Sequence, residues 1–516
     1  MLWVNDMIRV IVGLDFGSTY SGFSLYHVDS DDIKTNDYWS GDMGKLKTNT
    51  VLQYDDNYKD VKLWGHQALY RRPDKKSLKD KEMKPVELFK LYLGNCLEKY
   101  RPKLPVDYKK AISDYLREIG KVIKDTILIN WTGIDFMENV LLILPVPAEY
   151  SELDKAIMRE CAFNAGLINN RFSRKLQFTT EPEAAAVYCT NNILKQHNLI
   201  VTGTTFMIVD CGGGTVDLTT HTLLEDNTLG EITERSGDFC GSTFIDKEFI
   251  KLLKHIVGNE AIDLLSERHY GQLQYLIQDF CQNAKIPFNG DEPGFSYDLD
   301  FEESAPVLLQ YVTGSVKDLM EDKEWMIEID FNTIKSLFDP IVDRIIKMIR
   351  VQLNNSSKSE KCSAIFLVGG FSQSKYLQKR IKEEFIDLVG NISMPSQPDA
   401  AVLRGAAIYG KSLHQLKSMN RFKLEMVSPK WKEGDPPERR TSHGLIHKFR
   451  QQDAVYCDEP GVEFLGEFLI DLPDVKLGTK RICKLSILFG DMEIKANAIN
   501  ETSGQNYQTK FKFNDF

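Results

Sequence analysis

A short aspartate–glycine–threonine motif occurs twice in this chain, each time in the same local setting. The first copy is Asp15-Phe16-Gly17-Ser18-Thr19, and the second is Asp210-Cys211-Gly212-Gly213-Gly214-Thr215. Each copy ends an apolar, β-branched run and precedes an alternating stretch of strand type. Each therefore predicts a strand, a tight glycine turn and a second strand, rather than a strand that leads into a helix.

Two such hairpins have the chemistry of a phosphate clamp. Glycines allow backbone N–H groups to turn toward an anion and approach it closely. A carboxylate at a strand end could hold a cation, and a neighbouring hydroxyl could contact a phosphate oxygen. One copy alone could equally be an ordinary turn, but two copies in the same strand context favour a site that grips a polyphosphate such as ATP from both sides. Neither the Walker signature nor a G-x-G-x-x-G motif opening a helix is present in the sequence.

Composition sets broad limits on the kind of protein. A chain of 516 residues suggests about three or four compact units, and 42% hydrophobic with 27% charged residues is ordinary for a soluble globular protein. The net charge of −10 gives no electrostatic argument for nucleic acid or an anionic membrane, and no apolar run reaches the length of a membrane span. The start of the sequence lacks a basic region and a cleavage site. The nine cysteines contain no C-x-x-C pair, so we expect free thiols in a reducing, cytoplasmic compartment.

Periodicity predicts strands and helices in alternation along the first four hundred or so residues. Residues 140–148 are expected to form a buried strand stopped by prolines, followed by an amphipathic helix with Ile157, Cys161 and Ala165 on one face. Pro182 is expected in the first turn of a helix. Further expected elements are a helix after Gly241-Ser242-Thr243-Phe244, a polar helical subdomain over 257–330, a buried strand over 364–368, a helix over 376–385 and a packed helix over 398–407.

The character of the sequence changes near residue 413. Residues 421–450 are rich in Lys and Arg and contain Pro436-Pro437, which indicates a linker or irregular segment. A basic face for a partner is the alternative, although a solvated loop is favoured. From Gly461 onward, alternation predicts about four strands in a small sheet.

Four motifs, taken together and in this order, resemble the actin-like ATPase superfamily and, within it, the ATPase domain of 70-kDa heat-shock (DnaK-type) chaperones. They are Gly13–Tyr20, Glu181–Ala186, Val209–Asp217 and Val368–Ser372. The resemblance covers about residues 8–412. Cys240–Phe244, Gly370–Ser374 and Leu488–Ala496 are most similar to the subgroup called heat shock 70 kDa protein 12.

The resemblance implies an α/β fold, namely a duplicated two-lobe, actin-like (ribonuclease H-like) ATPase fold followed by a small β-rich C-terminal region. The ranges implied are 1–203 for the first lobe, 204–412 for the second, 413–460 for a linker or irregular segment, and 461–516 for a shortened substrate-binding-like sheet.

The same resemblance assigns roles to individual residues around ATP or ADP. Asp15 and Asp210 would hold Mg²⁺, largely through its waters. Glu181, Asp210 and Thr215 would orient the attacking water, while Asp217 would add negative charge that a monovalent cation such as K⁺ could offset. Groups that would contact the nucleotide are Gly17, Ser18, Thr19, Tyr20, Gly212, Gly213, Gly214, Thr215, Gly241, Ser242, Gln282, Lys285, Gly369, Gly370, Phe371, Gln373 and Asp399.

This sequence departs from the family pattern at two places. The catalytic lysine of the first lobe lacks its usual flanking residues, and Lys90 is our choice, with a surface lysine as the alternative. At the nucleoside end, Lys285 could reach the ribose, but the arginine that stacks on adenine has become Ile286. Loss of that contact would remove about 1 kcal/mol from adenine binding. Gln373 stands where the family's second arginine over the base would be.

Three functions remain open from the sequence. The favoured one is an ATP-binding, slowly ATP-hydrolysing chaperone-like protein that relays lobe closure to a C-terminal module for an unknown protein client. A non-catalytic, nucleotide-gated scaffold is the second. A small-metabolite kinase is the least favoured, because no aspartate base in a substrate cleft can be identified. Nucleic acid and membrane partners are not expected.

Overall fold

The structure, a computed structural model, divides into two units, Met1–Leu416 and Lys417–Phe516. It describes residues 8–30, 32–69, 84–94, 96, 98, 101–190, 201–224, 229–231, 236–356 and 362–419, and beyond these the strands 445–449, 462–467, 483–489, 494–500 and 506–511. The polar stretch 71–85 lies almost wholly outside the described residues.

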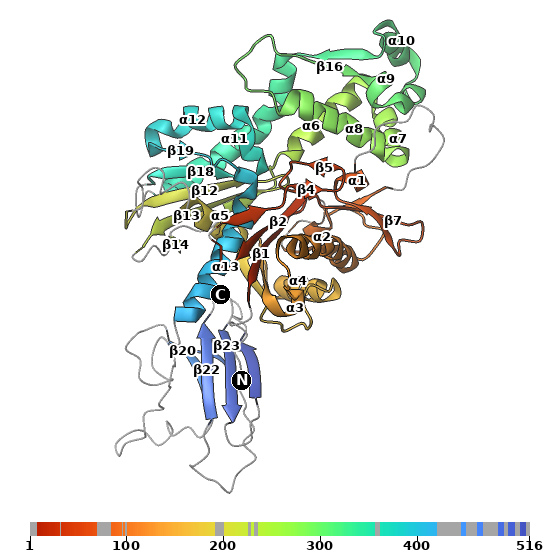
Figure 1. Cartoon of the computed structure of the whole chain (residues 1–516). Coiled ribbons are helices and arrows are strands. Elements are labelled where there is room, and N and C mark those ends of the chain that lie inside the picture. Colours follow the sequence, from red (N-terminus) through yellow and green to blue (C-terminus); the bar gives the residue numbers. More distant parts are fainter. Residues whose placement is uncertain are drawn as a thin grey trace. The chain divides into compact units, whose positions relative to one another are not determined.

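The first unit contains a six-stranded sheet in the order β11-β10-β1-β2-β3, with β6 beside β2 (Figure 1). Its strands are β1 (Val10–Phe16), β2 (Tyr20–His27), β3 (Ile33–Thr35), β6 (Thr48–Asn49), β10 (Val140–Val146) and β11 (Leu176–Thr180). β1 is antiparallel to β2 and parallel to β10. The first predicted hairpin is therefore confirmed.

β10 ends at Val146, directly before Pro147, so a proline stops the strand as predicted, although Pro145 lies inside it. The strand continues through Pro145, which pairs with Thr179 of β11. The pairing between β10 and β1 reaches only to Ile143, so at Pro145 the strand has a neighbour on one side only. A missing backbone N–H is tolerated at such a local edge.

A second six-stranded sheet repeats this arrangement, with the order β14-β13-β12-β18-β19 and β15 beside β13. Its strands are β12 (Thr205–Cys211), β13 (Val216–Leu223), β14 (Leu229–Glu231), β15 (Ser236–Asp238), β18 (Ala364–Val368) and β19 (Ile392–Ser393). β12 is antiparallel to β13 and parallel to β18, as β1 is to β2 and β10. The second predicted hairpin is confirmed. In each sheet, parallel strands extend the hairpin on one side and short antiparallel strands extend it on the other.

Two helices join the sheets through small residues. α5 (Glu181–Cys189) and α13 (Ala401–Met419) share one buried cluster with Ile11 and Ile143 of the first sheet and Phe206 and Phe366 of the second. A side chain on Gly405 of α13 would overlap the carbonyl of Ala184, so glycine allows the two helices to touch. Pro182 lies in the first turn of α5, as predicted.

The remaining helices cover the sheets or form a separate group. α2 (Tyr108–Asn130) packs on α4 (Glu152–Asn164) beside the first sheet. Figure 1 shows α7 to α10 and β16 gathered at one end of the unit. The helices of the second half are α6 (Thr243–Val257), α7 (Asn259–Arg268), α8 (Tyr270–Phe280), α9 (Phe301–Ser304), α10 (Gly314–Asp322), α11 (Phe331–Ser356) and α12 (Lys375–Val389). The helical subdomain expected over 257–330 also contains a hairpin, β16 (Tyr297–Asp300) with β17 (Met326–Ile329).

Smaller elements complete the first unit. They are β4 (Tyr38–Trp39), β5 (Asp42–Met43), β7 (Val51–Tyr54), β8 (Val61–Trp64), β9 (Val86–Glu87), α1 (His66–Leu69), α3 (Phe136–Asn139) and the short helical turns η2 (Phe89–Tyr92), η6 (Cys281–Lys285), η7 (Pro306–Gln310), η8 (Gly370–Gln373) and η9 (Pro398–Ala400).

The second unit is described through its strands. β22 (Cys483–Phe489), β23 (Ile494–Asn500) and β24 (Asn506–Phe511) form an antiparallel sheet. β20 (Leu445–Phe449) pairs with β21 (Val462–Glu467). The whole of β20 falls in the range 413–460, which was expected to be a linker or irregular segment. Residue 413, where this expected linker begins, lies inside α13, which continues to Met419.

Candidate functional site

The turns of the two hairpins lie against each other. The first turn follows β1 and the second follows β12, and a Cβ atom on Gly213 would overlap Oγ1 of Thr19. None of Gly17, Gly212 or Gly213 has a positive φ. Close approach of the two turns, rather than left-handed backbone, therefore requires the glycine at position 213.

The second turn is fixed to the start of α6. The carbonyl of Gly212 accepts from the N–H of Ser242 at 3.1 Å, and the carbonyl of Gly213 accepts from the N–H of Thr243 at 2.9 Å. A side chain on Gly241 would overlap the backbone of Gly213. The sequence-predicted residues Gly241 and Ser242 thus fix the start of a long helix to the glycine turn, and backbone carbonyls accept from the first N–H groups of that helix.

Four acidic residues gather behind the turns. Asp15 lies near the end of β1 and is buried. Asp210 lies near the end of β12 opposite Asp217 of β13, and Glu181 is the first residue of α5. Burial, followed by the charge of Glu181, raises the pKa of Asp210 to about 7. Burial, followed by Glu149 and Glu181, raises the pKa of Asp217 well above its usual range. These carboxylates act on one another through their charges. Together they outnumber the positively charged side chains that contact them.

The N-terminal geometry of α5 holds Glu181 in place. Thr180 and Glu183 form a capping box, in which the Thr180 hydroxyl accepts from the Glu183 N–H at 3.3 Å and the Glu183 carboxylate accepts from the Thr180 N–H at 3.0 Å. The cap fixes the first turn of the helix and therefore the position of the neighbouring Glu181 carboxylate.

Two lysines bind these acids. Nζ of Lys90 lies 2.7 Å from Oε1 of Glu181, and the Lys90 side chain is only 5% exposed. Nζ of Lys47 lies 2.5 Å from Oδ2 of Asp15. Burial alone would lower the pKa of Lys47, but Asp15, Asp210 and Asp399 raise it above its usual range. The structure thus brings the sequence-predicted Lys90 to Glu181 and adds Lys47, which the sequence analysis missed.

Strand register is the signal that could have identified Lys47. Ser21 of β2 pairs with Thr48 of β6, so Lys47 comes beside Gly22. Gly22 in turn pairs with Asp15 across the first hairpin. The pairing of β6 with β2 is not local, and a single sequence does not reveal it.

The glycine turn after β18, Gly369-Gly370, is the third glycine turn at this site. It also reaches the acidic cluster, which is the group formed by Asp15, Glu181, Asp210 and Asp217. Gly369 has a φ of +82°, and a side chain there would overlap Oδ1 of Asp210. Its N–H donates to the carbonyl of Pro398, next to Asp399. Gly370 and Gln373 are exposed, whereas the side chain of Phe371 is buried in the core. If Phe371 contacts a nucleotide as predicted, its backbone rather than its buried side chain would make the contact.

The residues expected at the nucleoside end, Gln282, Lys285 and Ile286, lie in and directly after η6. Nζ of Lys285 donates to the Ser242 carbonyl at 2.7 Å and pairs with Asp246 at 2.6 Å. Gln282 is exposed, and Ile286 is 66% exposed just after the π-helical turn η6. Tyr20, at the start of β2, is also exposed. Protein groups thus accept from Lys285 at two points, and its contact with a ribose stays a prediction.

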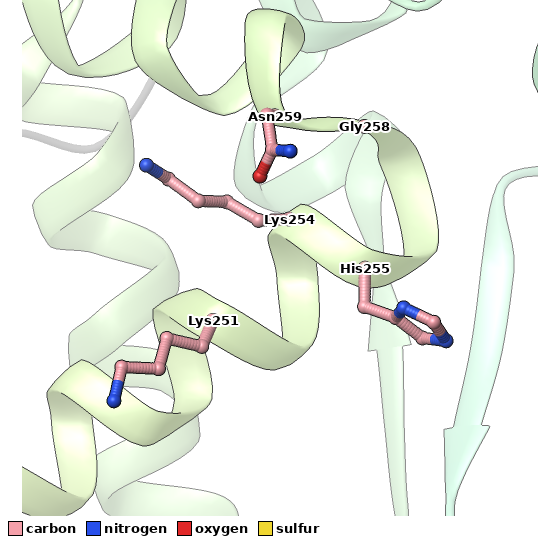
Figure 2. A pocket seen from close by; sticks show the side chains of 5 residues that line it. All are labelled: Lys251, Lys254, His255, Gly258 and Asn259. Carbon is pink, nitrogen blue, oxygen red and sulfur yellow. The ribbon is translucent and has the colours of Figure 1, made fainter.

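A separate hollow of about 460 Å³ lies at the junction of α6 and α7 (Figure 2). It is lined by Lys251, Lys254, His255, Gly258 and Asn259. Lys251 pairs with Glu248 and Lys254 with Asp263, so both lysines already have acidic partners. None of its residues belongs to the acidic cluster.

No three His, Cys, Asp or Glu side chains in the part of the chain that the structure describes are grouped so as to ligate a metal directly. No helix within it combines the length and apolar character needed to cross a membrane.

Comparison with known proteins agrees with the motifs. The family profile described as Hsp70 protein matches residues 141–431. The chain is 24% identical to heat shock 70 kDa protein 12A of Mus musculus over 98% of this chain and 91% of that protein. It is 23% identical to heat shock 70 kDa protein 12B of Homo sapiens over 73% of this chain and 71% of that protein. Chaperone protein dnaK1 of Prochlorococcus marinus is 25% identical over 52% of this chain and 35% of its own length. The chain belongs to the Hsp70 family of nucleotide-binding chaperones.

Proposed function

We propose that this protein binds ATP between two lobes, residues 1–203 and 204–412, and hydrolyses it slowly to ADP and phosphate. The observation that supports this most strongly is the contact between the two glycine turns at Thr19 and Gly213, with Asp15, Glu181 and Asp210 behind it. Backbone N–H groups of the two glycine turns would hold the phosphates.

The acidic cluster has suitable donors for Mg²⁺. Carboxylate oxygens are the ligands that this ion prefers. Burial, followed by the charges of neighbouring acids, raises the pKa of Asp210 and Asp217, and a nearby cation would favour their charged forms. Asp15 and Asp210 would hold Mg²⁺ largely through its waters, and a monovalent cation such as K⁺ would lie near Asp217. When bound, Mg²⁺ would neutralise charge on the phosphate oxygens.

The chain's own groups would position water and stabilise charge. Glu181, Asp210 and Thr215 would orient the attacking water toward the terminal phosphate, and Lys90 would place positive charge beside it. Since no covalent intermediate is needed, the chemistry depends on positioning and on preorganised charge. Closure of the lobes would be relayed to the C-terminal β region, residues 461–516, where a protein client would bind. We propose a cytoplasmic location for this activity.

A coupled phosphate-release assay with Mg·ATP tests the activity. Asp210→Asn should abolish metal-dependent hydrolysis with little loss of fold, whereas Asp263→Asn, which changes an exposed partner of Lys254, should not. Adding sugars should leave phosphate release unchanged, which separates an ATPase from a kinase. Full activity in a folded Asp210→Asn protein would refute the assignment.

A non-catalytic, nucleotide-gated scaffold is the second candidate. The exposure of Ile286 and the pairing of Lys285 with Asp246 favour it, because both remove contacts from the expected nucleoside end. Tight nucleotide binding without phosphate release would support this scaffold over the ATPase.

A further inference from the structure

Lys47 reaches Asp15 across a glycine. Gly22 pairs with Asp15 in the first hairpin, and a Cβ atom at position 22 would lie 2.9 Å from Cγ of Lys47. The lysine side chain therefore runs over a strand position that has no side chain of its own. Its Nζ ends 2.5 Å from Oδ2 of Asp15.

The ion pair lies among the groups that would surround the phosphates. The side chains of Asp15 and Lys47 are 6% and 19% exposed, so both charges are largely withdrawn from water. Asp210 and Asp399 also act on the Lys47 ammonium. An ammonium has three N–H donors. With one directed to Asp15, the others remain available to an anion at the glycine turns.

We propose that Lys47 is a built-in counter-cation for the nucleotide's phosphates, which supplements Mg²⁺ so that part of the affinity for ATP remains when the metal is removed. This rests on the proposed function, because it concerns the same phosphate site. The lysine shares Asp15 with the metal position and supplies fixed positive charge there without an ion from solution. Neutralisation of phosphate charge is thus divided between a side chain and the metal.

A purely structural ion pair is the competing explanation. In that case Lys47 would only hold β6 against the first hairpin. Its removal would then lower stability and weaken ATP binding by the same factor whether or not Mg²⁺ is present. The dependence of affinity on metal therefore separates the two explanations.

The test is calorimetric binding of ATP to the full chain in excess Mg²⁺ and in excess EDTA. For the unmodified chain, ATP should still bind measurably in EDTA, although more weakly than in Mg²⁺. Lys47→Met should lower the affinity in EDTA by at least about tenfold and the affinity in Mg²⁺ by no more than about threefold. Lys47→Arg, which keeps the charge, should restore binding in EDTA at least in part. Lys45→Met, two residues earlier on an exposed side chain, is the matched control and should change neither value.

Each other outcome contradicts the proposal. Tight binding in Mg²⁺ with none in EDTA would overturn the counter-cation while leaving the proposed function intact. Equal losses for Lys47→Met in both solutions would identify a structural pair instead. Absence of binding in both solutions would overturn the proposed function itself. Because the comparison of the two solutions needs only the unmodified chain, the proposal can be refuted even if Lys47→Met does not fold.

Discussion

Lys90 and Glu181 form a largely buried ion pair although 91 positions separate them in the sequence. Lys90 lies in the short helical turn η2, after Leu88, whose φ of 58° is left-handed. Its Nζ also lies 5.6 Å from the centre of the Phe16 ring, at the end of β1. A lysine held by an acid, an aromatic ring and a turn is preorganised, so it can stabilise charge without rearranging.

The first prediction concerns this lysine. Lys90→Met should lower ATP hydrolysis by about 10²-fold while weakening ATP binding much less, because its charge acts mainly on the transition state. Single-turnover phosphate release and calorimetric binding measure the two effects. Lys121→Met removes a lysine from an exposed pair with Glu118 and should leave both unchanged. Normal hydrolysis by a folded Lys90→Met protein would show that another group supplies the charge.

The second prediction uses a glycine whose surroundings are open. A Cβ atom on Gly214 would have no protein atom within 4 Å, and Gly214 does not have a positive φ. Gly214→Ala should therefore leave the unfolding temperature nearly unchanged. If phosphates occupy the space beside this turn, the added methyl group should weaken ATP binding by about tenfold or more.

Gly294→Ala is the matched control, since a Cβ atom there also meets nothing and the residue is far along the chain from all three glycine turns. It should change neither stability nor binding. Unaltered ATP affinity in Gly214→Ala would mean that the phosphates do not lie beside the second turn.

The parts of the fold that local sequence determines could be predicted. Each hairpin follows from a β-branched run that ends in an Asp–Gly turn, and the start of α5 follows from Pro182. Asp15 and Asp210 came from these same local motifs, whereas Glu181 and Asp217 were implied by the resemblance to 70-kDa heat-shock chaperones. They depend on strand ends and helix starts, which are set within a few residues.

Features set by distant pairing could not be predicted. Lys47 contacts Asp15 only because β6 pairs with β2 in one register. The hairpin of β16 and β17 joins two short strands without a tight turn, so nothing near either strand signals the other. The partner of Lys285 was missed because Asp246 lies on a different helix, α6. In each case tertiary contact decided the outcome.

The third prediction concerns stability and pH at Asp114 on α2. Its carboxylate accepts from Tyr54 Oη at 2.9 Å and also from Lys110 and Arg117. Burial would raise the pKa of Asp114, but these donors together lower it below its ordinary value of 3.8. Asp114→Asn should therefore reduce the free energy of unfolding by about 2 kcal/mol near neutral pH, since it removes charge-assisted hydrogen bonds.

The sign of the pH effect follows from the lowered pKa. The stabilisation is fully present above the unfolded-state pKa and is lost as pH falls through the folded-state pKa. The difference between the unmodified chain and Asp114→Asn should thus shrink as pH is lowered from ~7 to ~3 in chemical denaturation. Asp125→Asn, on an exposed position of the same helix, should show no such difference. A constant difference across this range would mean that the carboxylate charge does not stabilise the fold.

The last prediction concerns adenine recognition at Ile286. This side chain is 66% exposed and stands where the family has an arginine that stacks on the base. Most of the binding free energy should then come from the phosphates, and ATP should be preferred over GTP only modestly. Ile286→Arg should tighten ATP binding by up to about tenfold, or ~1.4 kcal/mol, because a guanidinium could stack on the exposed face of the base. Ile129→Arg, at an 83% exposed position on α2, adds the same charge far along the chain and is the control. Competition binding of ATP and GTP to the three proteins measures the effect. A strong preference for ATP that Ile286→Arg does not alter would show that other residues already hold the base.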